Sequence, residues 1–210
     1  METLDAVAFD TTGWTLEETS EAARRWRDAA GDALSLDRFA LPPDLAAPLD
    51  RLDPIRAQLR RMIADVGGGL VEVELGRWGD LACLRSIVKV PQRPHGMTYV
   101  GSFTLPLRDL SYVLKVQCVE RGMTGLRDAI VFGQHSLPIG ADGTPEGWMA
   151  DPYDPTFRLG VRRNLADDPR WDAQFPDHPL SRARRHLARL EATLTAAPSL
   201  LAAPPFRGGA

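Results

Sequence analysis

The alternation of apolar and polar residues through the middle of the chain predicts a series of β-strands. In the last of them Tyr112, Leu114 and Val116 share one face, while Val113 and Lys115 lie on the other, which is the period of two that a strand requires. Short links connect these segments, and since a parallel crossover needs a dozen or more residues, sequence neighbours run antiparallel. The expected strands are residues 70–75, 82–90, 97–105 and 110–120.

Two stretches with apolar residues three and four positions apart predict amphipathic helices that cover the sheet. Residues 50–66 place leucine, isoleucine and methionine on one side and arginines elsewhere, and three glycines follow. Residues 181–195 present Leu187, Leu190 and Leu194 as an apolar stripe. Helix therefore covers at least one face of the sheet.

A shorter helix is expected over residues 124–132, directly after the last strand. Thr124 is suited to cap its N-terminus, and Gly133 to close it. We expect Arg127 and Asp128 to lie at the surface. The residues expected to face inward are Leu126, Ala129 and Ile130.

The first forty residues allow two interpretations. Apolar and polar residues alternate over 22–28 and 33–39 with a Gly-Asp turn between them, which is typical of a β-hairpin. The competing interpretation is a helix over residues 17–30, which are rich in Glu, Ala and Arg. We favour the hairpin, and expect a further edge strand over residues 5–10.

A long segment with many prolines, residues 135–179, separates the sheet from the last helix. Connections of this length without regular structure are unusual in a compact domain and often carry function. Residues 197–210 are small and rich in proline, and we expect a flexible tail there. Residues 1–196 are expected to form a single α+β domain.

The fold class expected is α+β, an antiparallel β-sheet meander flanked by α-helices. The order of elements between residues 32 and 132, with the segments GDLACLR (79–85), MTYVGSF (97–103) and YVLKV (112–116), resembles the α/β/α sandwich of the PsbP and Mog-type superfamily. That superfamily includes photosystem II extrinsic subunits, a Ran-binding nuclear-import factor and effector chaperones of type VI secretion. The resemblance implies binding rather than catalysis, and it transfers no individual functional residue.

Composition and charge narrow the class of protein. A net charge of −3 argues against a nucleic-acid binder, which needs a clustered surplus of cations. No apolar run approaches the roughly 18 residues of a membrane span, and the N-terminus has no secretory signal, so we expect no membrane insertion. Cys83 and Cys118 have neither zinc nor redox spacing, and we expect buried thiols in a reducing cytoplasm.

The irregular segment is the part of the chain richest in side chains suited to binding. Aromatic residues and arginine dominate the energetics of protein interfaces. We therefore expect a non-catalytic protein-binding module, such as an adaptor, chaperone or immunity-like protein in a bacterial cytosol, whose partner is another protein and which needs no cofactor. The candidate binding residues are Trp148, Asp151, Tyr153, Asp154, Trp171, Phe175, His178 and Arg182.

An alternative hypothesis is a hydrolase with a site built from Asp154, Asp172 and His178. Acid–base groups far apart in sequence can meet in the fold, because catalysis needs closeness in space. No phosphate-binding loop, dinucleotide fingerprint or nucleophile elbow occurs in the chain. We expect no metal site, since no pair of ligands has helical spacing and prolines interrupt any calcium-loop pattern.

Overall fold

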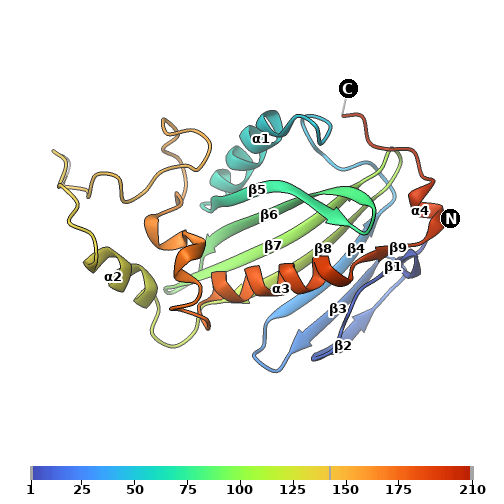
Figure 1. Ribbon diagram of the computed structural model, residues 1–210, viewed down its shortest axis with the longest axis horizontal. Coiled ribbons are helices and arrows are strands. Elements are labelled where there is room, and N and C mark those ends of the chain that lie inside the picture. Colours follow the sequence, from blue (N-terminus) through green and yellow to red (C-terminus); the bar gives the residue numbers. More distant parts are fainter. Residues whose placement is uncertain (1, 142, 209–210) are drawn as a thin grey trace.

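A seven-stranded antiparallel sheet forms the centre of the computed structural model, which describes residues 2–141 and 143–208 (Figure 1). The expected meander is confirmed, and each of its strands pairs with the next along the chain. The N-terminal strands extend it, with Leu36 opposite Leu114 at the junction. From edge to edge the strands are β2 (Trp14–Thr19), β3 (Ala23–Asp28), β4 (Ala33–Phe39), β8 (Ser111–Val119), β7 (Met97–Pro106), β6 (Leu81–Pro91) and β5 (Gly69–Trp78).

The helices lie outside this sheet, and among the described residues none is both long and apolar enough to cross a bilayer. A second, two-stranded sheet joins the start of the chain to the end of the last long helix. The helices are α1 (Leu52–Asp65), α2 (Leu126–Gly133), α3 (Pro179–Thr193) and α4 (Pro198–Leu201). The small sheet consists of β1 (Val7–Ala8) and β9 (Thr195–Ala196), and 3-10 turns occur at η1 (Leu4–Ala6), η2 (Leu165–Asp167) and η3 (Pro169–Trp171).

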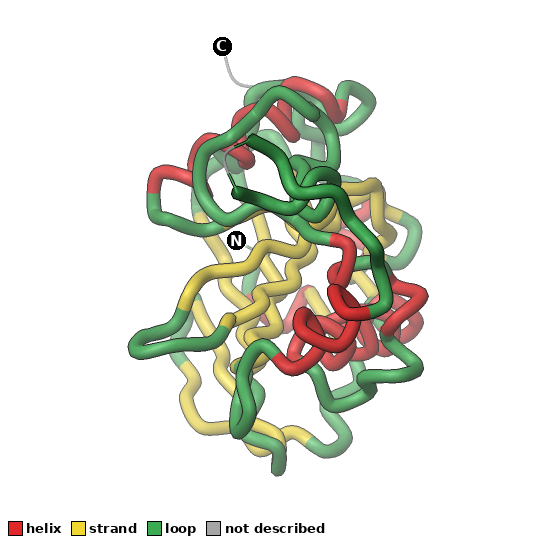
Figure 2. Tube along the Cα trace, turned by 90° about the vertical axis from the view of Figure 1, so that its left-hand side faces the viewer, coloured by secondary structure: helices red, strands yellow, loops and turns green. Residues whose placement is uncertain are grey.

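Helix α3 lies along one face of the sheet and forms the larger of the two cores (Figures 1 and 2). Its predicted apolar stripe is confirmed, because Leu187 and Leu190 are buried against β7 and β8. Gly101 of β7 permits this close approach. A Cβ atom at Gly101 would lie 2.7 Å from Cδ1 of Leu187, so a larger residue would force the Leu187 side chain to shift.

The opposite face of the sheet is covered at one end only. Helix α1 buries Ile55 there against Leu70 and Val73 of β5. Over β3, β4 and β8 the same face carries polar side chains, Lys115 and Gln117 among them, around a hollow of about 410 Å³. One face of the sheet is thus packed along its length, and the other is half open.

The N-terminal hairpin is confirmed, since β3 and β4 pair with Trp26 opposite Leu34. The competing helix over residues 17–30 is wrong. Strand β2 was not expected, because all its residues after Trp14 are exposed and the alternation that marks a half-buried strand is missing. The edge strand expected over residues 5–10 shrinks to the two residues of β1, which follow a 3-10 turn.

Helix α2 presents a different face to the core from the one expected. Arg127 and Val131 are its buried residues, whereas Leu126 and Ile130 are exposed. The prediction that Arg127 lies at the surface is therefore wrong. Its guanidinium is buried because it binds a carbonyl group and a carboxylate inside the protein. Thr124 is not the cap either: the N-cap is Gly125, whose N–H donates to Oε1 of Glu120 at 2.7 Å.

The C-terminal residues expected to be a flexible tail pack against the body as far as the structure describes them. Leu200 of α4 is fully buried in the larger core. Beyond it Pro205 forms an isolated β-bridge with Leu107, and Phe206 packs on the core beneath α1. A small, proline-rich composition predicts fraying, but these few apolar side chains are enough to fasten the segment.

Candidate functional site

A groove of about 590 Å³ opens where β8 leads into α2 and where the irregular segment leads into α3. Figure 1 places α2 at one end of the molecule, beyond the sheet. The mouth of the groove is apolar and open to solvent, and the exposed face of α2 continues it. The apolar residues of the walls are Ala30, Met123, Leu126, Phe175, Pro176 and Pro179, and Ile130, one turn after Leu126, is the exposed apolar residue that continues them along the helix.

The guanidinium of Arg127 ties the two walls of the groove together. Its side chain is 1% exposed and comes from α2. Nε donates to the carbonyl of Ala166 at 2.6 Å, and Nη2 donates to the carbonyl of Asp168 at 3.0 Å. Nη1 donates to Oγ of Ser181 at 2.8 Å and to Oδ1 of Asp172 at 3.0 Å. One buried side chain thus holds α2, the turns η2 and η3 and the start of α3 in register.

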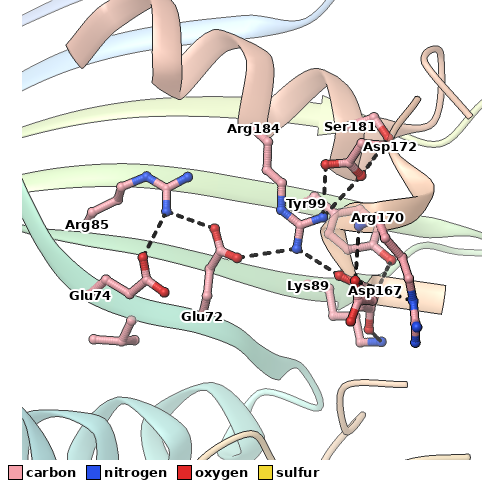
Figure 3. A network of polar contacts seen from close by, with 12 residues as sticks. Glu72, Glu74, Arg85, Lys89, Tyr99, Asp167, Arg170, Asp172, Ser181 and Arg184 are labelled. Atoms are coloured by element: carbon pink, nitrogen blue, oxygen red, sulfur yellow. Dashed lines mark hydrogen bonds and ion pairs between the residues drawn. The ribbon is translucent and has the colours of Figure 1, made fainter. Parts of the chain in front are cut away.

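A buried ion pair anchors the first of those turns to the sheet (Figure 3). Nζ of Lys89 on β6 lies 2.6 Å from Oδ2 of Asp167, and the hydroxyl of Tyr99 on β7 donates to Oδ1 at 3.0 Å. Asp167 also closes a capping box with Asn164. Burial raises the pKa of Tyr99, so this hydroxyl keeps its proton and stays a donor.

Arg184 of α3 extends this polar chain toward the edge of the sheet, as Figure 3 shows. Its Nη1 lies 3.1 Å from Oδ1 of Asp172, and its Nη2 lies 3.3 Å from Oε2 of Glu72 on β5. Arg85 lies 2.9 Å from the other oxygen of Glu72. The turns beside the groove are therefore fastened to α3 and to β5 at once.

Arg182 of α3 lines the groove and is bound to the hairpin turn between β3 and β4. Its Nε and Nη2 donate to the two oxygens of Asp32 at 2.8 and 2.9 Å, and Nη2 also donates to the carbonyl of Val119. Asp32 is fully buried. A two-point contact of this kind fixes the arginine in one orientation.

His178 lines the groove as an uncharged group. Its Nδ1 accepts the N–H of Leu180 and so caps α3, and its ring lies edge-on to Tyr99 with centroids 5.5 Å apart. Burial, followed by the charge of Arg127, lowers the pKa of His178 to about 3. The imidazole is therefore neutral at physiological pH and acts as a helix cap.

The protein is expected to lose stability as the pH falls below 6.5, the usual pKa of histidine. The unfolded chain takes up a proton on His178 that the folded protein does not bind until the pH approaches 3. Each pH unit in that window then lowers the free energy of unfolding by up to about 1.4 kcal/mol. Urea unfolding across this range, compared with His178→Asn, measures the contribution.

The matched control for this experiment is His95→Asn, because His95 is exposed in the link between β6 and β7. His95→Asn should keep the pH slope of the wild type, whereas His178→Asn should flatten it. A slope unchanged in His178→Asn would mean that the protons are taken up elsewhere.

The candidate binding residues from the sequence fall into two groups. Trp171, Phe175, His178 and Arg182 lie at or beside the groove, with Nε1 of Trp171 bound to the carbonyl of Leu165. Phe175, His178 and Arg182 line one wall of the groove, and their role in binding stays a prediction.

The other four residues lie against α1, β5 and α2. Asp151 and Asp154 both form ion pairs with Arg60 of α1 at 3.2 Å. The hydroxyl of Tyr153 accepts the N–H of Val73 at 2.6 Å and lies 3.1 Å from its carbonyl, at the edge of the sheet. Trp148 packs edge-on against Phe132 of α2, with centroids 5.1 Å apart. These side chains fasten the irregular segment to the body.

The three residues of the hydrolase hypothesis have separate partners. Asp154 is bound by Arg60 and Thr156, and Asp172 by Arg127, Arg184 and Ser181. Among the described residues, His178 forms no hydrogen bond with either aspartate. The hypothesis stays a prediction, and the contacts of these side chains are those of structural anchors.

Sequence reasoning missed the wall of the groove that comes from α2. This wall consists of Met123, Leu126 and Arg127, which lie just after β8. The pattern of the short helix predicts that Leu126 is buried and Arg127 exposed, and the structure shows the reverse. The available signal was the pair of glycines, Gly122 and Gly125, which both adopt positive φ and turn the intervening Met123 out into solvent.

Comparisons with known proteins do not identify a family. No family model matches the chain, and no curated protein matches it. One solved structure that it resembles is a crystal structure at 1.50 Å resolution of a protein from Bacteroides thetaiotaomicron. The identity is 12%, the TM-score is 0.34, and the match covers 57% of this chain and 39% of that one. A likeness this distant carries no argument about function, and the resemblance to the PsbP and Mog-type superfamily stays a prediction.

Proposed function

We propose that this protein is a non-catalytic protein-binding module whose groove beside α2 receives an apolar segment of its partner. The supporting observation is an apolar hollow of about 590 Å³ that continues into an exposed apolar helix face. Exposed apolar hollows of this kind are typical of protein interaction sites, since a partner side chain that enters one loses much of its contact with water. The contacts of Arg127 and Arg182 hold the walls in place before binding, which reduces the entropic cost of association.

The charges at the rim favour a partner segment that carries acidic residues beside its apolar ones. Arg121 and Arg185 are exposed, and each donates to a backbone carbonyl, of Gly31 and Pro176 respectively. Neither forms an ion pair within residues 2–141 and 143–208. Two carboxylates, the exposed Asp177 and the buried Glu120, also line the groove, so the favourable place for an acidic residue of the partner is beside Arg121 and Arg185.

An adaptor, chaperone or immunity-like protein in a bacterial cytosol would use such a groove. Each of these classes works by holding one segment of another protein rather than by changing it chemically. The two free cysteines, Cys83 and Cys118, are both buried, which accords with a reducing compartment.

Leu126→Asp is expected to abolish ligand binding in the groove without unfolding the protein. Leu126 is 43% exposed at the first turn of α2, where an acidic residue is favourable for the helix. The first probe is the fluorescent anion anilinonaphthalene sulfonate, which combines an apolar ring system with a negative charge. The second is a displayed peptide library, which we expect to enrich apolar sequences with acidic neighbours that compete with the dye.

The control is Leu201→Asp, because Leu201 is also 43% exposed. It lies on α4, at the other end of the molecule from α2 (Figure 1). It should bind the dye and the enriched peptides as the wild type does. Equal binding by Leu126→Asp and the wild type would reject the groove as the site. Enrichment of peptides without acidic residues would reject the charge argument.

A further inference from the structure

Three side chains able to bind a metal ion converge beneath the β3–β4 turn. Of the contacts described so far, only the one between Arg182 and Asp32 belongs to this cluster. They are Asp32 from the turn, Cys118 from β8 and His186 from α3. Their ligand atoms all lie within 4.8 Å of one another, and the first two residues are fully buried. Their wide separation in sequence hid this set from the search for zinc spacing.

The geometry points to a binding site for a divalent transition-metal ion of the zinc class, held by Oδ2 of Asp32, Sγ of Cys118 and Nε2 of His186. Thiolate, imidazole and carboxylate are the three ligand types that zinc uses in proteins. Three protein ligands leave a fourth tetrahedral position to water. The inference is independent of the proposed groove.

The spacing of the ligand atoms suits such an ion. Bonds of about 2.0–2.3 Å at tetrahedral angles separate ligand atoms by about 3.3–3.8 Å. Nε2 of His186 lies 3.3 Å from Oδ2 of Asp32, and 3.7 Å from Oδ2 of Asp28 in the neighbouring strand. The distances to Sγ of Cys118 lie within 4.8 Å, so closing around the ion needs side-chain movements of up to about 1–1.5 Å.

The hydrogens of the cluster also mark where a cation would lie. Nε2 of His186 faces two carboxylates, which can only accept, so it carries a hydrogen. The Sγ atom of Cys118 lies within 4.8 Å of the ligand atoms of Asp32 and His186. The imidazole hydrogen and the thiol thus lie beside one carboxylate. A metal ion takes the place of the two hydrogens when the thiol releases its proton to solvent and the imidazole carries its hydrogen on Nδ1.

Arg182 fits this site as the outer partner of the aspartate. Each carboxylate oxygen has two acceptor positions, and Arg182 occupies one on each oxygen of Asp32, at 2.9 and 2.8 Å. That leaves Oδ2 a second position on the side of His186. Partners of this kind orient a ligand in metal sites. The ring of Trp14, 5.0 Å from that of His186, closes the cluster from the outside.

The test is a Co²⁺ titration of the metal-free full-length protein, followed by competition with Zn²⁺. We expect a thiolate-to-cobalt charge-transfer band that saturates at one ion per chain. Cys118→Ser should abolish the band. His186→Gln should weaken Zn²⁺ binding by more than the roughly 10–100-fold that loss of an outer partner causes. Zn²⁺ should raise the Tm of the wild type and not that of His186→Gln.

The matched control is Cys83→Ser, because Cys83 is the other buried thiol. Its charged neighbours Glu191, Arg77 and Arg85 include no histidine. Cys83→Ser should keep the cobalt band. A band that is absent from the folded wild type, persists in Cys118→Ser or disappears in Cys83→Ser overturns the proposal. Circular dichroism monitors folding, and if Cys118→Ser does not fold, His186→Gln decides.

Discussion

Replacing Arg127 by alanine is expected to lower the free energy of unfolding by about 3–5 kcal/mol, the cost of breaking a buried charge pair by removing one partner. The variant leaves the Asp172 carboxylate without this cation and the carbonyls of Ala166 and Asp168 without their donor. Each buried acceptor that loses its partner keeps its desolvation penalty. Urea unfolding of the two proteins at neutral pH measures the difference.

Arg170→Ala is the control for this variant. Arg170 is a neighbouring arginine whose side chain is 59% exposed and lies 3.6 Å from Asp168. Exposed pairs of this kind contribute about 0–1 kcal/mol, so the control should unfold close to the wild type. If Arg127→Ala loses less than about 1 kcal/mol, Arg127 does not hold the walls of the groove. The same variant should also bind the dye more weakly, because α2 loses its main anchor.

Replacing Lys89 by methionine is expected to cost a similar amount, about 3–5 kcal/mol. The side chains of Lys89 and Asp167 are 3% and 1% exposed, so neither charge reaches water. Burial alone would raise the pKa of Asp167, but the Lys89 ammonium, together with the hydrogen bonds from Asn164 and Tyr99, outweighs burial and lowers the pKa. Without Lys89 the carboxyl must either stay charged in an apolar environment or take up a proton, and both are unfavourable. Urea unfolding again gives the loss.

The chain offers an almost ideal control, because its other lysine is Lys115. Lys115 is 42% exposed and shares Asp37 with Arg25, so Lys115→Met should cost about 1 kcal/mol or less. The double variant Lys89→Met with Asp167→Leu should recover part of the loss, because it removes both buried charges. Equal stability of Lys89→Met and Lys115→Met would contradict the buried-pair argument.

The meander was predictable because each of its strands buries one face in the larger core. Tyr112, Leu114 and Val116 alternate with less buried residues, and this period of two is visible without a structure. Strand β2 was not predictable in the same way, since it lies at the sheet edge with both faces in water. Its hydrogen bonds to β3 define it, and a backbone contact leaves no mark in the hydrophobic pattern.

The groove was half predictable for a related reason. Phe175 and His178 belong to a segment whose aromatic and charged composition drew attention to it. Helix α2 has only two turns, and in such a short element the apolar Leu126 and Ile130 cannot be distinguished from core residues by spacing. What decides the orientation is Arg127, whose partners lie some forty residues away in sequence and become visible only in the fold.

The contact of Tyr153 with β5 also governs how the protein meets other copies of itself. An outermost strand with free N–H and C=O groups is a template for aggregation. At Val73 both groups are occupied by the Tyr153 hydroxyl, and the carbonyl of Gly68 accepts the N–H of Val161, so an incoming strand would first have to displace the irregular segment. The far edge, β2, is protected by charge instead: Glu17 and Glu18 would repel their counterparts in an approaching β2.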